Sequence, residues 1–145
     1  MSDEETITRT LKVFFDEMGA WESWCAKRSR ERQPSDKTPE AHEESKALSI
    51  AALRRIFEKY CTTWDEPQRA EGGGIHYSMI PLYGADLEEI LEVVVSEDTA
   101  RVVTKQKAGI KHTCIYYLNR TDSGWRIEDN RKRLNNKGVE VDYDL

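Results

Sequence analysis

Four side chains of this chain could act as general acids or bases: His76, His112, Tyr116 and Asp129. Such chemistry needs a group whose pKa is shifted by burial and that has a hydrogen-bonding partner. In an extended chain, alternation places His112 with Tyr116 and directs Asp129 to the same side as Trp125. One inward aspartate beside a histidine and a tyrosine from neighbouring strands could form an acid–base pair. Such residues are more often hydrogen-bonded structural groups, so we predict no catalytic residue and keep catalysis as the alternative.

The cysteines and histidines lack the spacing of a metal site. Cys25, Cys61 and Cys114 are far apart and form no CxxC pair. The three histidines give no ligand pattern either. A glycine run at 72–74 has no Lys-Ser/Thr after it, so it is not a phosphate-binding loop. We therefore predict no metal, no cofactor, and reduced thiols of the kind found in cytoplasmic proteins.

A row of carboxylates near the last residue of the chain has the chemistry of a binding surface. Glu140, Asp142 and Asp144 alternate with apolar residues over 139–145, so an extended segment carries all three on one face. Such a row could attract a basic protein and speed its association. The alternative is an edge strand whose charges only prevent pairing with other sheets.

A second candidate surface combines four carboxylates with two tyrosines that precede them. Its members are Tyr77, Tyr83, Asp86, Glu88, Glu89 and Glu92. Glu88 and Glu92 share a face both on a helix and in a regular strand, whereas Glu89 faces the other way in the strand. Tyrosines are common anchors in protein interfaces. We predict that this group contacts a partner, and a solvated rim is the alternative.

The hydrophobic pattern indicates two long helices followed by strands. Apolar residues recur at spacings of three and four over 5–30 and again over 39–62. Gly19 interrupts the first run, which suggests a bend or a close contact there. Charged residues and Pro34 predict a loop or linker at 29–40. Strands are predicted at 75–80, 87–96, 100–106, 112–119, 125–132 and 139–145.

Grouped helices before a run of strands indicate an α+β fold, in which N-terminal helices pack against a curved, mostly antiparallel sheet. Such a sheet bends around the helix into a cone whose concave side can form a pocket. The hairpin at 114–127 turns at Asp122-Ser123-Gly124. Trp125 and Ile127 after this turn are expected to face the core and to fix the strand register.

Size and composition indicate a single domain over 1–145. A chain of 145 residues can bury a core without staples. The net charge of −5 argues against a nucleic-acid partner and is compatible with a basic protein. No apolar run approaches about eighteen residues, and the first residues lack a secretory-signal pattern. We therefore expect no membrane partner and a cytoplasmic location.

The segments 83–93, 100–104, 116–118 and 124–127 follow one another in a recognisable order. They read YGADLEEILEV, ARVVT, YYL and GWRI. This order resembles the nuclear transport factor 2-like fold, and 83–91 is similar to bacterial immunity proteins of that fold from polymorphic toxin systems. The resemblance covers 48–141 and marks the scaffold without assigning roles to residues.

The resemblance implies a small bacterial protein that binds a cognate toxin stoichiometrically and occludes it. No catalytic residue is needed for such a role. Relatives of the fold also include isomerases and dehydratases with a pocket in the cone, and many form homodimers. We therefore expect a toxin that is basic at the contact, and both a small-molecule pocket and a homodimer stay open.

Overall fold

Two helices precede six strands in the part of the chain that the structure describes. This computed structural model describes residues 2–32, 38–62, 82–128 and 130–145, without the side chains of Asn130 and Asp144. The elements are α1 (Asp3–Arg30), α2 (Pro39–Tyr60), β1 (Glu88–Ser96), β2 (Thr99–Gln106), β3 (Thr113–Thr121), β4 (Gly124–Ile127), β5 (Asn130–Leu134) and β6 (Glu140–Asp144). The predicted α+β class is therefore confirmed.

Both helices begin at residues that cap them. The Ser2 hydroxyl accepts a hydrogen bond from the Glu5 amide at 3.1 Å, and Thr38 does the same for Ala41 at 3.1 Å. Pro39 follows the second cap at a position where its missing N–H costs nothing. The connection between α1 and α2 is thus shorter than the predicted loop at 29–40. The apolar stripe of α1 is buried, as the spacing predicts.

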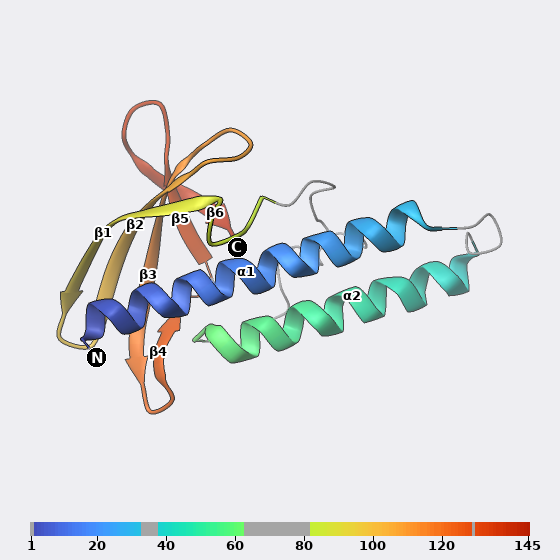
Figure 1. Cartoon of the computed structure of the whole chain (residues 1–145), viewed down its shortest axis with the longest axis horizontal. Coiled ribbons are helices and arrows are strands. Elements are labelled where there is room, and N and C mark those ends of the chain that lie inside the picture. Colours follow the sequence, from blue (N-terminus) through green and yellow to red (C-terminus); the bar gives the residue numbers. More distant parts are fainter. Residues whose placement is uncertain (1, 33–37, 63–81, 129) are drawn as a thin grey trace.

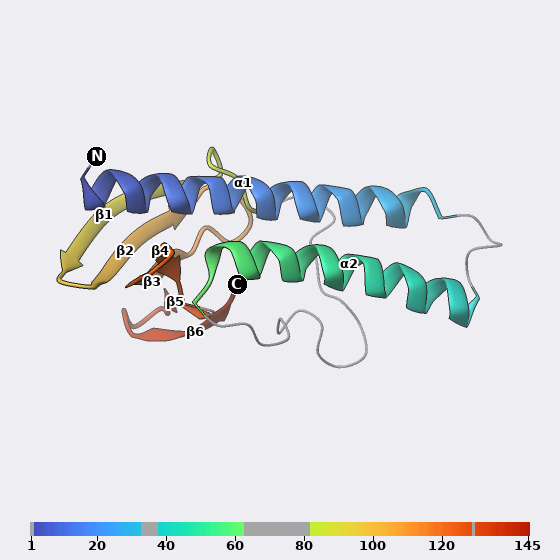
Figure 2. The same cartoon turned by 90° about the horizontal axis from the view of Figure 1, so that it is seen from below.

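The strands form one antiparallel sheet in the order β1-β2-β3-β5-β6, and β4 pairs with β3 outside this path. The strands curve around the N-terminal half of α1, and α2 runs back alongside α1 (Figures 1 and 2). A parallel bridge from Cys61 to Ile127 joins the end of α2 to β4. β1 and β6 are the two ends of the path, so each has one side without a strand partner in the described chain.

The single strand predicted at 125–132 is wrong, because the structure divides it into β4 and β5. β4 pairs with the second half of β3, and β5 pairs with Cys114 and Ile115 near the beginning of β3. Each short strand thus covers a different part of the nine-residue β3. The strand predicted at 75–80 lies outside the described residues. Trp125 and Ile127 are buried in the core, as predicted.

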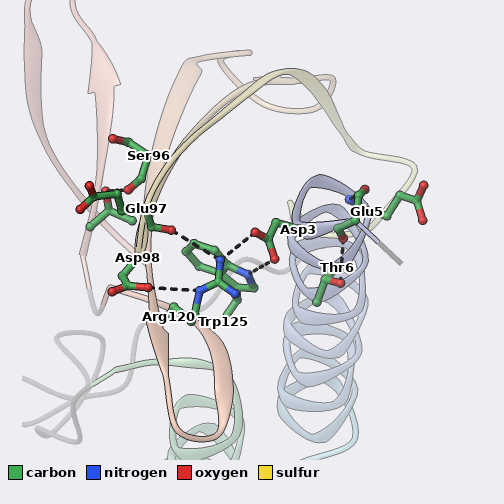
Figure 3. A network of polar contacts seen from close by, with 10 residues as sticks. Asp3, Glu5, Thr6, Ser96, Glu97, Asp98, Arg120 and Trp125 are labelled. Atoms are coloured by element: carbon green, nitrogen blue, oxygen red, sulfur yellow. Dashed lines mark hydrogen bonds and ion pairs between the residues drawn. The ribbon is translucent and has the colours of Figure 1, made fainter.

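Arg120 holds the first turn of α1 against two connections of the sheet (Figure 3). Its guanidinium lies 2.7 Å from Asp3 Oδ2 and 3.3 Å from Asp98 Oδ1, and it stacks over the Trp125 ring at 4.7 Å. Hydrogen bonds from Arg120 and Trp125 lower the pKa of the Asp3 carboxyl. These contacts fix where the beginning of α1 lies relative to β1.

Candidate protein-binding surface

The alternation of side chains between the two faces of the sheet is interrupted partway along β1. Its register against β2 shifts between Ile90 and Glu92, so Leu91 forms a β-bulge. An extra residue reverses the alternation of side chains. Glu88 is therefore buried, with 2% of its surface exposed, whereas Glu89 and Glu92 are exposed. The prediction that Glu88 and Glu92 share a face is wrong because a regular strand was assumed.

The Glu88 carboxylate belongs to a buried polar network on the concave side of the sheet. The Thr104 hydroxyl donates to its Oε2 at 2.6 Å, and its Oε1 lies 4.0 Å from an Arg131 nitrogen. Arg131 also donates to the Tyr116 hydroxyl at 2.6 Å and lies over the Tyr143 ring at 4.1 Å. A buried charge is tolerable only when it is paired. Glu88 and Arg131 therefore depend on each other inside the fold.

Tyr83 is also an interior residue, with 3% of its surface exposed. The Arg131 guanidinium lies 4.9 Å from its ring centre. The Tyr83 backbone amide donates to Glu22 Oε1 at 3.2 Å, and a Cβ added at Gly19 would come within 2.3 Å of the Tyr83 carbonyl oxygen. The chain thus presses directly on α1 at this point. A surface role as an interface anchor does not suit Tyr83 or Glu88, because both are buried.

Two of the four acid–base candidates, His112 and Tyr116, lie in the described part of the chain. His76 and Asp129 lie outside the described residues. Burial raises the pKa of the Tyr116 hydroxyl well above its usual value, and Phe15 packs on its ring at 5.4 Å. Partial burial, with nearby arginines, lowers the pKa of His112, whose ring meets Tyr143 edge-on. Within the described part of the chain, no hydrogen bond joins His112 to Tyr116.

A groove of about 500 Å³ separates α1 from β1. Its helical wall is formed by Glu4, Thr8 and Lys12, which are spaced by four and so lie on one stripe. Its other wall includes all six consecutive residues 88–93. Neighbouring residues of a strand point to opposite faces. A wall built from consecutive residues is therefore the edge of β1 and not one of its faces.

Acidic side chains predominate along this groove. The exposed carboxylates that line it belong to Glu4, Asp86, Glu89 and Glu92, and the exposed lysines are Lys12 and Lys107. The bulged Leu91 adds an apolar side chain that is 54% exposed. We name this surface the α1–β1 groove. It combines negative charge, apolar area and a strand edge, which together suit a protein partner.

Two of the three carboxylates near the last residue have partners within the chain. Glu140 accepts a hydrogen bond from the Tyr117 hydroxyl at 2.5 Å and lies 3.9 Å from Arg101. Asp142 pairs with Lys132 across the strands. Glu140 and Asp142 do share the outer face of the sheet, and the side chain of Asp144 lies outside the described residues. That this row binds a partner stays a prediction.

The structure brings together only part of the second predicted group. Asp86, Glu89 and Glu92 line the α1–β1 groove, and Tyr77 lies outside the described residues. The sequence reasoning missed Glu4 and Lys12, although their spacing marks a polar stripe on the first helix. The signal that would have joined this stripe to β1 is a tertiary one, so spacing alone could not supply it.

The described residues hold neither a metal cluster nor a membrane-spanning helix. They contain no group of three or more His, Cys, Asp or Glu side chains that could hold a metal ion. Neither described helix has an apolar stretch sufficient to cross a bilayer. The α1–β1 groove is therefore the candidate surface that the described residues support best.

Comparison with known proteins identifies one match. A family model described as NTF2 fold immunity protein matches residues 6–141. This range runs from the first turn of α1 into β6, so it includes the β1 wall of the groove and, of the helical wall, Thr8 and Lys12. No curated protein and no solved structure shows significant similarity to the chain.

Proposed function

The chain belongs to the family of NTF2 fold immunity proteins, and from this membership we propose that it neutralises one cognate toxin by binding it stoichiometrically. The resemblance that the sequence suggested is thereby confirmed at the level of the family. The observation that carries the proposal is the match over residues 6–141, which covers nearly the whole chain. Neutralisation by binding needs a complementary surface and no catalytic group.

The α1–β1 groove is the surface that we propose for the toxin. Asp86, Glu89 and Glu92 are exposed along it and give it a negative field. Complementary charge speeds association and selects against wrong partners. Leu91 supplies apolar area that a partner would remove from water. The proposed toxin surface is therefore basic at its rim and apolar where it meets Leu91.

The proposal is tested with the toxin domain encoded by the gene next to that of this protein. Expression of that domain should stop growth of a bacterial host, and co-expression of this chain should restore it. In size-exclusion chromatography with light scattering, the purified pair should elute as a one-to-one complex. Growth arrest that persists despite co-expression, together with no complex, would contradict the proposal.

Two double charge reversals distinguish the two predicted acidic surfaces. Glu89→Lys with Glu92→Lys changes the groove, and Glu140→Lys with Asp142→Lys changes the C-terminal row by the same net charge. We expect the first pair to weaken toxin binding about tenfold or more and to reduce its salt dependence. The second pair should have a much smaller effect. The opposite ranking would move the site to β6.

A titration separates binding from the enzymatic alternative. If the chain acts by occlusion, toxin activity should fall linearly and end at one chain per toxin. A catalyst would protect at far lower ratios, because each molecule turns over many times. Substoichiometric protection would therefore favour an enzyme over an occluding partner.

A further inference from the structure

The two end strands of the sheet differ in how readily another strand could pair with them. β1 has nine residues and exposes Leu91, Val94 and Val95 at 54%, 47% and 37%. β6 has five residues, and its carboxylates at Glu140 and Asp142 are already paired. A long edge with exposed apolar residues is the type of strand that pairs with another chain. β1 is therefore the edge to consider.

The backbone hydrogen bonds show which groups of β1 point away from the sheet. The Lys107 amide donates to the Leu87 carbonyl at 2.8 Å, so these two residues form a hydrogen-bonded pair. In an antiparallel ladder, hydrogen-bonded and non-bonded pairs alternate. Following the register past the bulge, the N–H and C=O groups of Ile90, Val93 and Val95 point away from β2. No described residue supplies a backbone partner for them.

We infer that this edge of β1 accepts an extended segment of the toxin as an additional strand, an inference that rests on the function proposed above. Main-chain hydrogen bonds would then provide affinity, and side chains at alternate positions would provide specificity. The groove supplies the space, because its wall is the strand edge itself and its volume is about 500 Å³. A neighbouring strand needs about 4.8 Å of lateral room.

The charges on β1 indicate which side chains that toxin segment should carry. Glu89 and Glu92 point to the outer face and flank the edge. A second copy of this chain would place like charges opposite each other, which destabilises a strand pair. A toxin segment with lysine or arginine at alternate positions would instead face these carboxylates favourably. The occupant is therefore a basic extended segment and not a second copy.

Proline substitution tests the edge directly. Val93→Pro removes an N–H that points away from β2, so the ladder within the sheet is kept. The pyrrolidine ring also obstructs an incoming strand. The matched control is Asp142→Pro on β6, whose N–H points outward by the same reasoning from the Asn135–Val139 pair. Circular dichroism and thermal melts establish whether each variant is folded.

We expect Val93→Pro to lower toxin affinity about tenfold or more, which corresponds to one lost hydrogen bond with added obstruction. Asp142→Pro should leave affinity nearly unchanged. Equal binding by wild type and a folded Val93→Pro would overturn the inference. If Val93→Pro does not fold, hydrogen exchange of the wild-type chain decides: toxin binding should protect the amides of Ile90, Val93 and Val95.

These outcomes separate the inference from the function on which it rests. If the wild-type chain forms no complex, the proposed function fails. If the complex forms but the β1 amides exchange as fast as before, the toxin does not pair with this edge, so the inference fails while neutralisation by binding stands. Light scattering of the free chain checks the remaining occupant, since a dimer that Val93→Pro converts to a monomer would show that β1 pairs with a second copy.

Discussion

Glu88 and Glu89 are neighbours in sequence and lie in opposite surroundings. Glu88 points to the concave side, where Thr104 donates to it and Arg131 balances its charge. Glu89 points outward and lines the α1–β1 groove beside solvent. The same chemical group thus serves the interior in one position and the surface in the next. The acidic side chains of this protein therefore have two separate roles, one in the interior of the fold and one on its surface.

The difference between the two regions lies in what holds each carboxylate. The interior network is built from residues of several strands, and removal of Glu88 or Arg131 takes a buried counter-charge from the other. The groove carboxylates are solvated, so each can be changed without leaving a buried partner. The residues that would contact a partner along the groove can therefore change, while the interior network holds the strands of the sheet together.

The largest expected effect follows from breaking the interior pair. Glu88→Ala removes the carboxylate whose Oε1 lies 4.0 Å from a nitrogen of the buried Arg131, and it should lower the free energy of unfolding by about 3–5 kcal/mol. Glu89→Ala should change it by no more than about 0.5 kcal/mol, as for other surface substitutions. Urea denaturation of the two variants measures both values. Equal destabilisation would show that the two carboxylates do not differ as described.

A smaller effect is expected where the segment at Tyr83 presses on α1. Glycine in a helix interior costs about 1 kcal/mol against alanine, so Gly19→Ala would ordinarily stabilise α1. Here the added Cβ would lie 2.3 Å from the Tyr83 carbonyl oxygen. Displacing that backbone should outweigh the helical gain and lower stability by about 1–2 kcal/mol.

Gly84→Ala is the matched control for this prediction. The nearest atoms to a Cβ at Gly84 belong to the Leu87 side chain, at 3.4 Å, which is an ordinary contact distance. Thermal melts of the two variants should therefore separate, with a lower midpoint for Gly19→Ala. A Gly19→Ala variant as stable as the wild-type chain would mean that Tyr83 is free to shift, and that the interior network tolerates movement.

The helices and most strands could be predicted because their signals are local. The stripe on α1 and the turn at Asp122-Ser123-Gly124 depend on residues a few positions apart. The division between β4 and β5 could not be predicted, because it depends on which part of β3 each one pairs with. Gly19 was recognised as unusual, but its neighbour Tyr83 is far away in sequence.

The candidate site was harder to predict for the same reason. A glutamate is rarely buried unless it is paired, so Glu88 resembles a surface residue until Arg131 is located beside it. The bulge at Leu91 is a property of the pairing between β1 and β2. The groove forms between α1 and β1, which are distant in the chain. Asp86, Glu89 and Glu92 could be found from sequence, but not the edge that they flank.

The smallest expected effect concerns pH at the rim of the interior network. Partial burial and the charges of Arg133, Arg131 and Lys105 lower the pKa of His112, whose ring lies against Tyr143. A histidine in the unfolded chain titrates near pH 6.5. Between its lowered pKa and about pH 6.5, the unfolded state binds more protons, so stability should fall as the pH falls through that window.

Above about pH 6.5 the imidazole is neutral in both states and contributes no slope. His112→Gln should therefore flatten the pH dependence of stability below pH 6.5 and leave the curve above it parallel to that of the wild-type chain. Urea denaturation at several pH values measures the difference. A steeper curve for the variant would mean that the neutral ring is not the form that the arginines around it favour.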